Sequence, residues 1–401
     1  MLEEKIVIAG RTAQNRVVIN PMEGCDCNKD GSPSELTEKK YLDYARSGAA
    51  IIWFEANAVC EEGRTNARQM HVNQENLSAF RALTDKIKTV SLRENGFKPI
   101  LVLQLTHSGR QSVKPIIAYR NPVYEKTRPL DDSFIATDEY LRSLPEKFAK
   151  SARLAKAAGF DAVDVKCCHG YLFQELLSAF SRPGAYGGSF ENRTRLLCDC
   201  FRSVKETVGD SMITASRLGV SDMVAYPNGF GTDSENNVDM SEPIKLVDRL
   251  IKEGLNLLNV TVGNPYYNPH VNRPFRKGAY LPPEEAKVGL ERFARVEKQL
   301  KTAFPNLVIV GSGVSYYRDD LIGQAEKLIE DGACDMVGFG REGLAYPEFY
   351  KDYLRGAFDA KRCCVACSRC TELMRNGCVS GCAVFNPYYK KLYEEKVLCK
   401  K

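Results

Sequence analysis

Long apolar runs and blocks of like charge are both missing from this sequence of 401 residues. No apolar run approaches the roughly 18 residues that a membrane-spanning helix needs. The opening MLEEKIVIAG also lacks the basic start and apolar core of a secretion signal. The net charge of +5 is spread over 56 basic and 51 acidic side chains. We therefore expect a cytoplasmic protein that binds neither membranes nor nucleic acid.

Short β-branched runs are abundant instead. Eight of them alternate with helical patterns such as residues 140–160 and 242–254, where apolar residues recur with the i, i+3, i+4 spacing of amphipathic helices. In a sequence, strands that are buried on both faces appear as nearly continuous apolar runs. The alternation predicts an α/β fold, a (β/α)8 TIM barrel over residues 1–360. The predicted strands are residues 16–20, 49–54, 99–105, 161–166, 212–218, 255–262, 306–313 and 334–340.

Two long connections interrupt this alternation, at residues 221–243 and 264–283. Both follow predicted strands, and the loops after barrel strands form the face on which TIM barrels build their active sites. We therefore predict that both connections are lids on the substrate side. The alternative is that they only decorate the surface.

Glycine-rich turns follow the last two predicted strands. Backbone N–H groups at this place in a barrel commonly bind phosphate, because glycine lets the main chain approach the ligand and an arginine supplies charge. Tyr316 replaces the last glycine of a GxGxxG fingerprint, so we expect no separate dinucleotide-binding fold. The predicted phosphate site consists of Gly311, Ser312, Gly313, Gly338, Gly340 and Arg341.

The fourth predicted strand ends in three chemically useful side chains, Lys166, His169 and Tyr171. A turn at the end of the strand can bring them toward one pocket, where they offer a cation, a hydrogen-bond donor and a weakly acidic phenol. Such a phenol can deliver a proton to a developing carbanion. A structural role is the alternative for each residue alone, whereas the cluster favours catalysis.

The sequence contains 15 cysteines, and crowded thiols in a long chain more often bind metal or do redox chemistry than form disulfides. Eight are scattered from Cys25 to Cys334, and we interpret most of them as small core residues. Within residues 361–401, three closely spaced cysteines can wrap three corners of a cubane cluster. Zinc is the alternative, although its thiolates usually come as two separate CxxC pairs, and Cys378 competes as the fourth ligand. The predicted 4Fe–4S ligands are Cys364, Cys367, Cys370 and Cys382.

Several motifs together resemble the old yellow enzyme family of NADH:flavin oxidoreductases, which are FMN-binding barrels. The string YGGSFENR is highly specific for this family, and the cysteine run resembles its iron–sulfur branch, which includes 2,4-dienoyl-CoA reductase and trimethylamine dehydrogenase. The resemblance covers nearly the whole chain. The motifs are NRVVINPM at 15–22, EANAVCEEGR at 55–64, LVLQLTHSGR at 101–110, HGYLFQELLS at 169–178, YGGSFENRTR at 186–195, VGSG at 310–313 and GFGREGLAYPEF at 338–349.

The resemblance implies bound FMN and gives roles to individual residues. Tyr171 falls at the position of the family's proton donor, and His169 falls at the second position of the pair that binds the substrate oxygen. A positive group beside the flavin O2 stabilises the reduced, anionic ring, which is the implied role of Arg217. The implied FMN contacts are Met22 and Ala58 along the ring, Gln104 at its pyrimidine edge, Arg217 near N1 and O2, and Gly313 and Arg341 at the phosphate.

Two residues depart from the family pattern. Lys166 stands where the first member of the oxygen-binding pair is usually His; it could neutralise a carboxylate or enolate more strongly, but with less directional preference. Glu23 stands where many relatives carry Thr or Cys beside the flavin, and an acidic neighbour would disfavour the anionic reduced ring. The loop after the sixth strand has no clean counterpart to the histidine of dienoyl-CoA reductase. Its candidate substrate contacts are Tyr266, Tyr267, His270 and Arg273.

The resemblance implies a flavin-dependent ene-reductase that passes hydride from FMN to the C=C bond of an unsaturated carbonyl or carboxylate compound. The sequence runs about twenty residues past Cys382, so we expect it to lack the nucleotide-binding domains of the iron–sulfur relatives. We expect a separate flavodoxin-like, ferredoxin or NAD(P)H-dependent protein to supply electrons through the cluster; direct reduction of FMN by NAD(P)H is the alternative. The rival functions are an amine dehydrogenase-like oxidation that exports electrons, against which Lys166 argues, and an electron-transfer subunit without catalysis.

Overall fold

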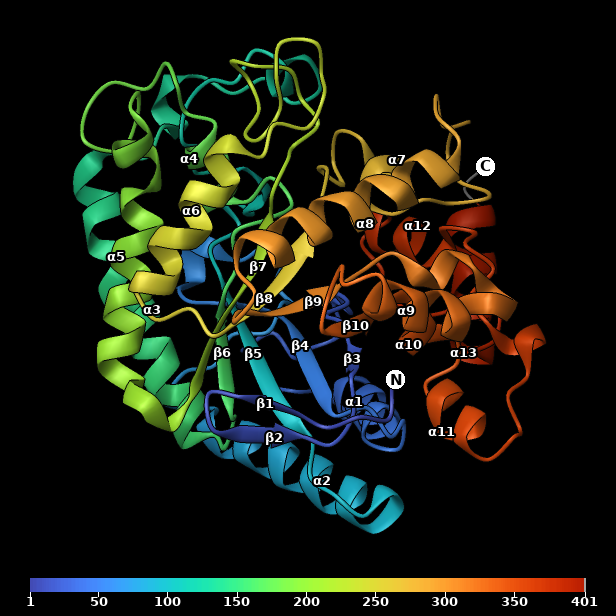
Figure 1. Ribbon diagram of the computed structural model, residues 1–401. Coiled ribbons are helices and arrows are strands. Elements are labelled where there is room, and N and C mark those ends of the chain that lie inside the picture. Colours follow the sequence, from blue (N-terminus) through green and yellow to red (C-terminus); the bar gives the residue numbers. More distant parts are fainter. Residues whose placement is uncertain (400–401) are drawn as a thin grey trace.

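The computed structural model describes residues 1–399, and its centre is a closed barrel of eight parallel strands (Figure 1). The strands follow one another around the barrel in chain order, and β10 pairs with β3 to close it. All the predicted strands are present, which confirms the TIM barrel. They are β3 (Val17–Ile19), β4 (Ile51–Ala58), β5 (Ile100–Thr106), β6 (Ala162–Val165), β7 (Ile213–Gly219), β8 (Leu257–Thr261), β9 (Val308–Gly311) and β10 (Met336–Phe339).

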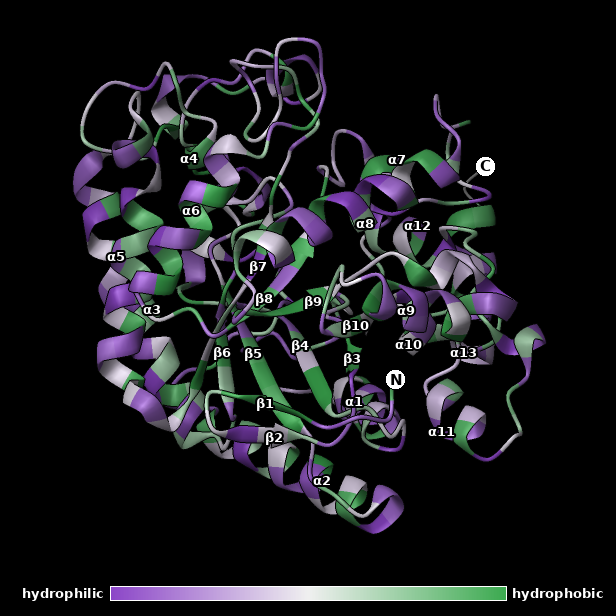
Figure 2. Cartoon of the chain, in the orientation of Figure 1, coloured by the Kyte–Doolittle hydropathy of each residue, from purple (hydrophilic) through white to green (hydrophobic). Residues whose placement is uncertain are grey.

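Helices surround the barrel and bury one side each against the strands. In α3, for example, Leu141, Leu144 and Phe148 are buried and recur at the predicted helical spacing. Figure 2 shows the strands as largely green and the outer helices as a mixture of green and purple. Within residues 1–399, none of the helices combines the length and the apolar character that crossing a bilayer demands. The helices up to residue 354 are α1 (Glu35–Ala45), α2 (Leu77–Asn95), α3 (Asp138–Ala157), α4 (Leu172–Leu177), α5 (Phe190–Val208), α6 (Ser241–Lys252), α7 (Pro269–Asn272), α8 (Ala286–Ala303), α9 (Leu321–Glu330), α10 (Arg341–Ala345) and α11 (Phe349–Leu354).

A short hairpin, β1 (Ile6–Ile8) with β2 (Arg11–Ala13), covers the N-terminal end of the barrel (Figure 1). Ile8 and Ala13 belong to the same apolar cluster as Trp53 and other side chains of the strands. This end of the barrel is therefore closed by packed apolar side chains. Space for a ligand is left at the opposite end, where the strands finish.

The C-terminal segment, drawn in red in Figure 1, packs beside the barrel as α12 (Arg369–Arg375), α13 (Pro387–Tyr393) and a short π-helical turn. It has a small apolar cluster of its own, which includes Leu373 and Tyr393. The Ser380 N–H donates a hydrogen bond of 2.7 Å to the Gly24 carbonyl, which ties the segment to the loop after β3. The domain boundary near residue 360 stays a prediction.

Candidate active site

A cavity of about 660 Å³ opens at the C-terminal end of the barrel, between the loops that follow the strands and the C-terminal segment. Of the two long connections, residues 264–283 contribute to its wall, whereas no residue of 221–243 does. The structure therefore places only one of the two predicted lids beside the cavity. The predicted cofactor, catalytic and substrate residues that line it are Met22, Glu23, Gln104, Lys166, His169, Tyr171, Arg217, Tyr266, Arg273, Ser312, Gly313, Gly338, Gly340 and Arg341.

Ala58, the predicted ring contact on β4, does not line the cavity. It is fully buried, and its N–H donates to the Met70 carbonyl at 2.8 Å. Ala56, two residues earlier, lines the cavity instead. The pairing of β4 with β5 shifts register between Trp53 and Ala56. Ala56 and Ala58 both follow this irregularity and, being two residues apart, share a face of β4, but only Ala56 lines the cavity.

Three other predicted residues also lie outside the cavity lining. Gly311 faces the core, because a Cβ added there would lie 2.8 Å from the sulfur of Cys334. The half-exposed ring of Tyr267 packs against another tyrosine ring, with 6.0 Å between the centroids. His270 has its Nδ1 2.7 Å from the hydroxyl of Tyr280. Neither Tyr267 nor His270 is therefore placed to contact a ligand in the cavity.

The predicted phosphate turns meet at one end of the cavity. Gly313 has a φ of 102°, which side chains rarely adopt, and a Cβ on Gly338 would lie 2.3 Å from Nδ2 of Asn20. Arg341 is buried, and its Nη1 has no hydrogen-bond partner among the described residues. A buried guanidinium without an anion is costly. Two glycine turns on the cavity wall together with an unsatisfied buried cation fit a phosphate group.

Glu297, which the sequence reasoning missed, supports this turn from behind. Its Oε1 accepts a hydrogen bond of 2.8 Å from the Ser312 N–H, and the side chain is fully buried on α8. Burial raises its pKa well above the usual value, and the Ser312 N–H acts in the opposite direction. The sequence did contain a signal for Glu297, because it is a glutamate on the apolar face of a predicted amphipathic helix.

Asp164 on β6 orients the groups on the cavity floor and was also missed. One carboxylate oxygen, Oδ2, accepts from Trp53 Nε1 at 2.8 Å and from Gln104 Nε2 at 2.6 Å. The other, Oδ1, accepts from the Arg217 N–H at 2.8 Å. Because the Gln104 amide nitrogen is used in this way, its carbonyl oxygen is the end left to accept a hydrogen bond from a ligand. An acidic residue in the middle of a buried strand could have been recognised in the sequence.

Lys166, His169 and Tyr171 line one wall, as predicted. Lys166 Nζ lies 3.9 Å from the centre of the Tyr171 ring. Burial, and then the charges of Arg217 and Lys166, lower the pKa of His169 well below its usual value, so the ring is neutral at pH 7. Burial, and then Tyr266 and Glu23, raise the pKa of Tyr171 well above its usual value. Tyr171 therefore holds its proton until a strong base forms beside it.

Glu23 adds a carboxyl group to the same cavity, and its Oε1 is buried without a partner. Burial, and then Glu55, raise its pKa to about 8, while Lys166 acts in the opposite direction. The negative charge expected beside the flavin therefore develops mainly above pH 8. Behind Glu23, Lys40 Nζ bonds to Asp26 Oδ2 at 2.9 Å and to Glu55 Oε1 at 2.5 Å.

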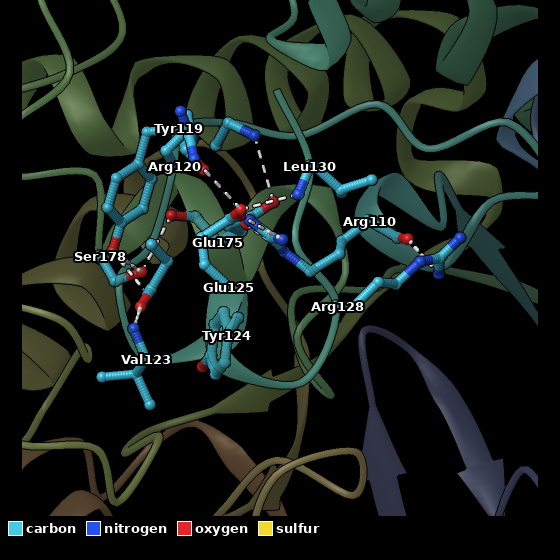
Figure 3. Close-up of polar contacts among 12 residues, drawn as sticks. Arg110, Tyr119, Arg120, Val123, Tyr124, Glu125, Arg128, Leu130, Glu175 and Ser178 are labelled. Carbon is cyan, nitrogen blue, oxygen red and sulfur yellow. Dashed lines mark hydrogen bonds and ion pairs between the residues drawn. The ribbon is translucent and has the colours of Figure 1, made fainter. Parts of the chain in front are cut away.

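A buried ion-pair network joins Arg110, Glu125 and Glu175 of α4 (Figure 3). Arg110 donates to Glu175 Oε1 at 2.8 Å and to Glu125 Oε1 at 3.0 Å. Glu175 lies on α4 and also accepts from the Ala118 N–H at 3.1 Å. Tyr171 is the N-cap residue that immediately precedes α4. The network therefore fixes the main chain that carries the candidate proton donor.

The sequence profile of the NADH:flavin oxidoreductase / NADH oxidase family matches residues 4–356. The chain belongs to this family. Membership confirms the resemblance and places the chain among flavin-dependent oxidoreductases. The NADH oxidase of Thermoanaerobacter brockii is 27% identical over 388 residues, which cover 93% of this chain and 52% of that relative. The NADPH dehydrogenase of Bacillus licheniformis is 27% identical over 359 residues, which cover 86% of this chain and 91% of that relative.

Solved structures of other proteins share the fold of this NADH:flavin oxidoreductase family member. A complex of 2-naphthoyl-CoA reductase with 2-naphthoyl-CoA matches with a TM-score of 0.79 and 21% identity, over 98% of this chain and 58% of that one. The old yellow enzyme homologue of Zymomonas mobilis matches with a TM-score of 0.67 and 22% identity, over 89% and 93%. The chain spans little more than half the length of the NADH oxidase and of the 2-naphthoyl-CoA reductase chain, at 52% and 58%.

The cysteine-rich segment of this family member adjoins the cavity, where Cys370 and Cys378 form part of the wall. Ala366 and Ser368 have φ values of 51° and 61°, so the main chain turns sharply between Cys364 and Cys370. The Ala366 N–H lies 3.4 Å from the Cys364 sulfur. Among residues 1–399, no group of three or more His, Cys, Asp or Glu side chains is arranged to hold a metal ion. The metal centre stays a prediction.

The two candidates for the fourth ligand differ in their surroundings. Burial raises the pKa of the Cys382 thiol, which also feels Cys370 and Cys367. The Cys378 sulfur points instead to the Asn376 carbonyl, at 3.7 Å. The choice of Cys382 over Cys378 as the fourth ligand stays a prediction.

Proposed function

We propose that this protein is an FMN-dependent ene-reductase that reduces an activated C=C bond of an unsaturated carbonyl or carboxylate compound. When bound, FMN would supply the hydride, and a 4Fe–4S cluster would supply single electrons to restore it. One observation carries the proposal. A phenol, a neutral imidazole and a lysine line the same 660 Å³ cavity as an unsatisfied buried arginine on paired glycine turns.

The cavity suits FMN at both of its ends. Gly313 and Arg341 would hold the phosphate, since both line the cavity and Arg341 Nη1 is buried without a partner. Gln104 would accept a hydrogen bond from the pyrimidine edge through its carbonyl oxygen, because its amide nitrogen already donates to Asp164. Arg217 would place its charge beside the ring, and its Nε is also buried without a partner. These unsatisfied groups support a resident anionic cofactor.

Lys166 and His169 would bind the activating oxygen of the substrate. Negative charge develops on that oxygen as hydride reaches the β-carbon, and a preorganised cation and donor stabilise it there. Tyr171 would then give its hydroxyl proton to the α-carbon. The Lys166 ammonium, 3.9 Å from the Tyr171 ring centre, would stabilise the phenolate that remains. Tyr171 would regain its proton from water.

The cysteine segment, taken as a domain of residues 361–401, supports a cubane more than a single zinc ion. Cys364, Cys367 and Cys370 are three consecutive, closely spaced cysteines, which suits three corners of a cubane, whereas zinc thiolates usually come as two separate CxxC pairs. Cys382 is close enough to Cys367 and Cys370 for their charges to affect its pKa. We propose a separate electron-donating protein as partner. NAD(P)H acting directly on FMN is the alternative, which the names of the NADH oxidase and NADPH dehydrogenase relatives favour.

The two rival functions have less support. A solved structure named histamine dehydrogenase shares the fold, but Lys166, Arg217 and Arg273 line the cavity here and would repel a cationic amine. An electron-transfer subunit would not need the arrangement of Tyr171 beside Lys166.

The proposal is tested with protein that is purified without oxygen and assayed for flavin, iron, sulfide and zinc. Dithionite should bleach the FMN, and an enone, an enoate or a dienoyl thioester should restore its colour. Tyr171→Phe should slow this recovery at least ten-fold, because the α-carbon must then take its proton from water. Recovery at one slow rate with and without every compound would contradict the reductase, and zinc without iron would contradict the cluster.

A further inference from the structure

Two arginines at the outer end of the cavity have no role in the proposed reduction. Arg68 comes from the loop after β4, and Arg375 comes from α12 in the C-terminal segment. Both line the same cavity as Lys166 and Tyr171. Arg375 and the nearby Gly377 are exposed, so this end is the mouth through which a ligand enters.

Both arginines are held in place without being neutralised. Arg68 Nη2 donates to the Gly377 carbonyl at 2.7 Å, and Arg375 Nη2 donates to the Pro265 carbonyl at 3.0 Å. In residues 1–399 neither side chain forms an ion pair, and the carboxylate next along α12, Glu372, is bonded to a tyrosine hydroxyl instead. A guanidinium has five N–H donors. Each arginine therefore keeps donors and a full charge for a ligand.

The cofactor does not account for these two charges. Arg341 and Arg217 already serve the FMN phosphate and ring in the proposed function. The cavity wall also includes apolar or aromatic side chains, namely Pro265, whose carbonyl binds Arg375, Tyr266, whose ring centre lies 6.5 Å from that of Tyr171, and Met374. A ligand that fits this wall has a flat or apolar body with an anionic group at its outer end.

From this arrangement we infer that the substrate is an unsaturated organic acid. Its carboxylate, remote from the reacting C=C bond, binds to Arg68 and Arg375 at the mouth, while its activating oxygen reaches Lys166 and His169. The inference rests on the proposed function for the identity of the reacting end. It gives the C-terminal segment a second role, because α12 supplies one of the two substrate-binding arginines. The phosphates of a nicotinamide nucleotide are also anions that two arginines can bind, and the test separates a substrate carboxylate from such a phosphate.

The test uses 4-carboxybenzylideneacetone, an enone with a remote carboxylate, and its neutral methyl ester. Both are offered to dithionite-reduced holoenzyme, and kcat/KM is measured for each. Binding of both to the oxidised holoenzyme is followed separately through the FMN absorption spectrum. The variants are Arg68→Gln, Arg375→Gln and Arg68→Lys, with Arg355→Gln as a control because Arg355 is exposed on the end of α11, outside the cavity.

The wild type should prefer the acid. Either glutamine variant should lower the acid-to-ester ratio of kcat/KM, and weaken acid binding, by roughly ten- to hundred-fold, the range for losing a charge-assisted hydrogen bond. Arg68→Lys should recover part of this loss, and Arg355→Gln should keep the wild-type ratio. A ratio that is the same in all four variants and the wild type would overturn the inference. The KM for NADH is measured separately, with NADH in place of dithionite. A rise in that KM in the glutamine variants, with an unchanged acid-to-ester ratio, would also overturn the inference, since a nucleotide would then be the ligand of the mouth.

Failure of the proposed function gives a different result. In that case neither the acid nor the ester restores the colour of the reduced flavin, although the acid still perturbs the spectrum of the oxidised enzyme in an arginine-dependent way. FMN content equal to that of the wild type shows that each variant has folded.

Discussion

Replacing Arg110 with Met should destabilise the protein by about 3–5 kcal/mol, the cost of removing one partner from a buried ion pair. The Arg110 side chain is 3% exposed, and its partner Glu175 is fully buried at 0%. Without Arg110, the Glu175 carboxylate keeps only the Ala118 N–H, and Glu125 loses its 3.0 Å contact. The methionine restores most of the buried volume, so the expected loss is mainly electrostatic.

The measurement is equilibrium unfolding in urea, followed by the fluorescence of the single tryptophan, Trp53, which is fully buried. Arg120→Met is the matched control, because Arg120 lies in the same loop but is 51% exposed and reaches Glu125 only at 3.8 Å. Exposed pairs of this kind contribute about 1 kcal/mol or less. The double variant Arg110→Met/Glu175→Gln should recover part of the stability, because it leaves no charge on residue 175 without a partner.

The loss should also depend on pH. Burial raises the pKa of Glu175, and Arg110 opposes this, so removing Arg110 raises that pKa further. A group with a raised pKa in the folded state favours folding when it is protonated. The deficit of Arg110→Met should therefore be smaller at pH 5 than at pH 8. A loss below 1 kcal/mol, or a deficit that shrinks as pH rises, would refute the assignment of Arg110 as the counter-ion of Glu175.

Three further predictions concern the cavity. Glu23 has its pKa raised to about 8, so the flavin midpoint potential should fall more steeply with pH above 8, by roughly 30 mV per pH unit, and Glu23→Gln should abolish this extra slope in a redox titration. Asp164→Asn should turn the Gln104 amide and leave one buried donor unpaired, which costs about 1–3 kcal/mol of binding free energy. Fluorescence titration should therefore show a five- to hundred-fold weaker affinity for FMN, and an unchanged affinity would contradict the role of Asp164. Cys382→Ala should lower iron and sulfide content and remove the broad visible absorption of the cluster, whereas Cys378→Ala should leave both in place, and the reverse result would make Cys378 the ligand.

Much of the site could be predicted because its residues lie at, or directly after, the C-terminal ends of the predicted strands. Once eight strands were recognised, the barrel placed the ends of all of them on one face. Lys166 and Gly313 therefore had to face a common cavity, although 147 positions separate them (313 − 166). The strand pattern could not tell which of the two alanines on this face of β4 lines the cavity, and the structure places Ala56 there instead of Ala58.

What the sequence determined by itself is the barrel, the family and the chemistry at the ends of the strands, because apolar periodicity and residue type are local properties of the chain. The tertiary structure alone decided which charges meet. Asp164 is joined to Trp53 across 111 positions, and Arg68 reaches a carbonyl 309 positions away in the C-terminal segment. The pKa of Glu23 and the open charges at the mouth depend on burial and on such distant neighbours, and a linear pattern contains neither.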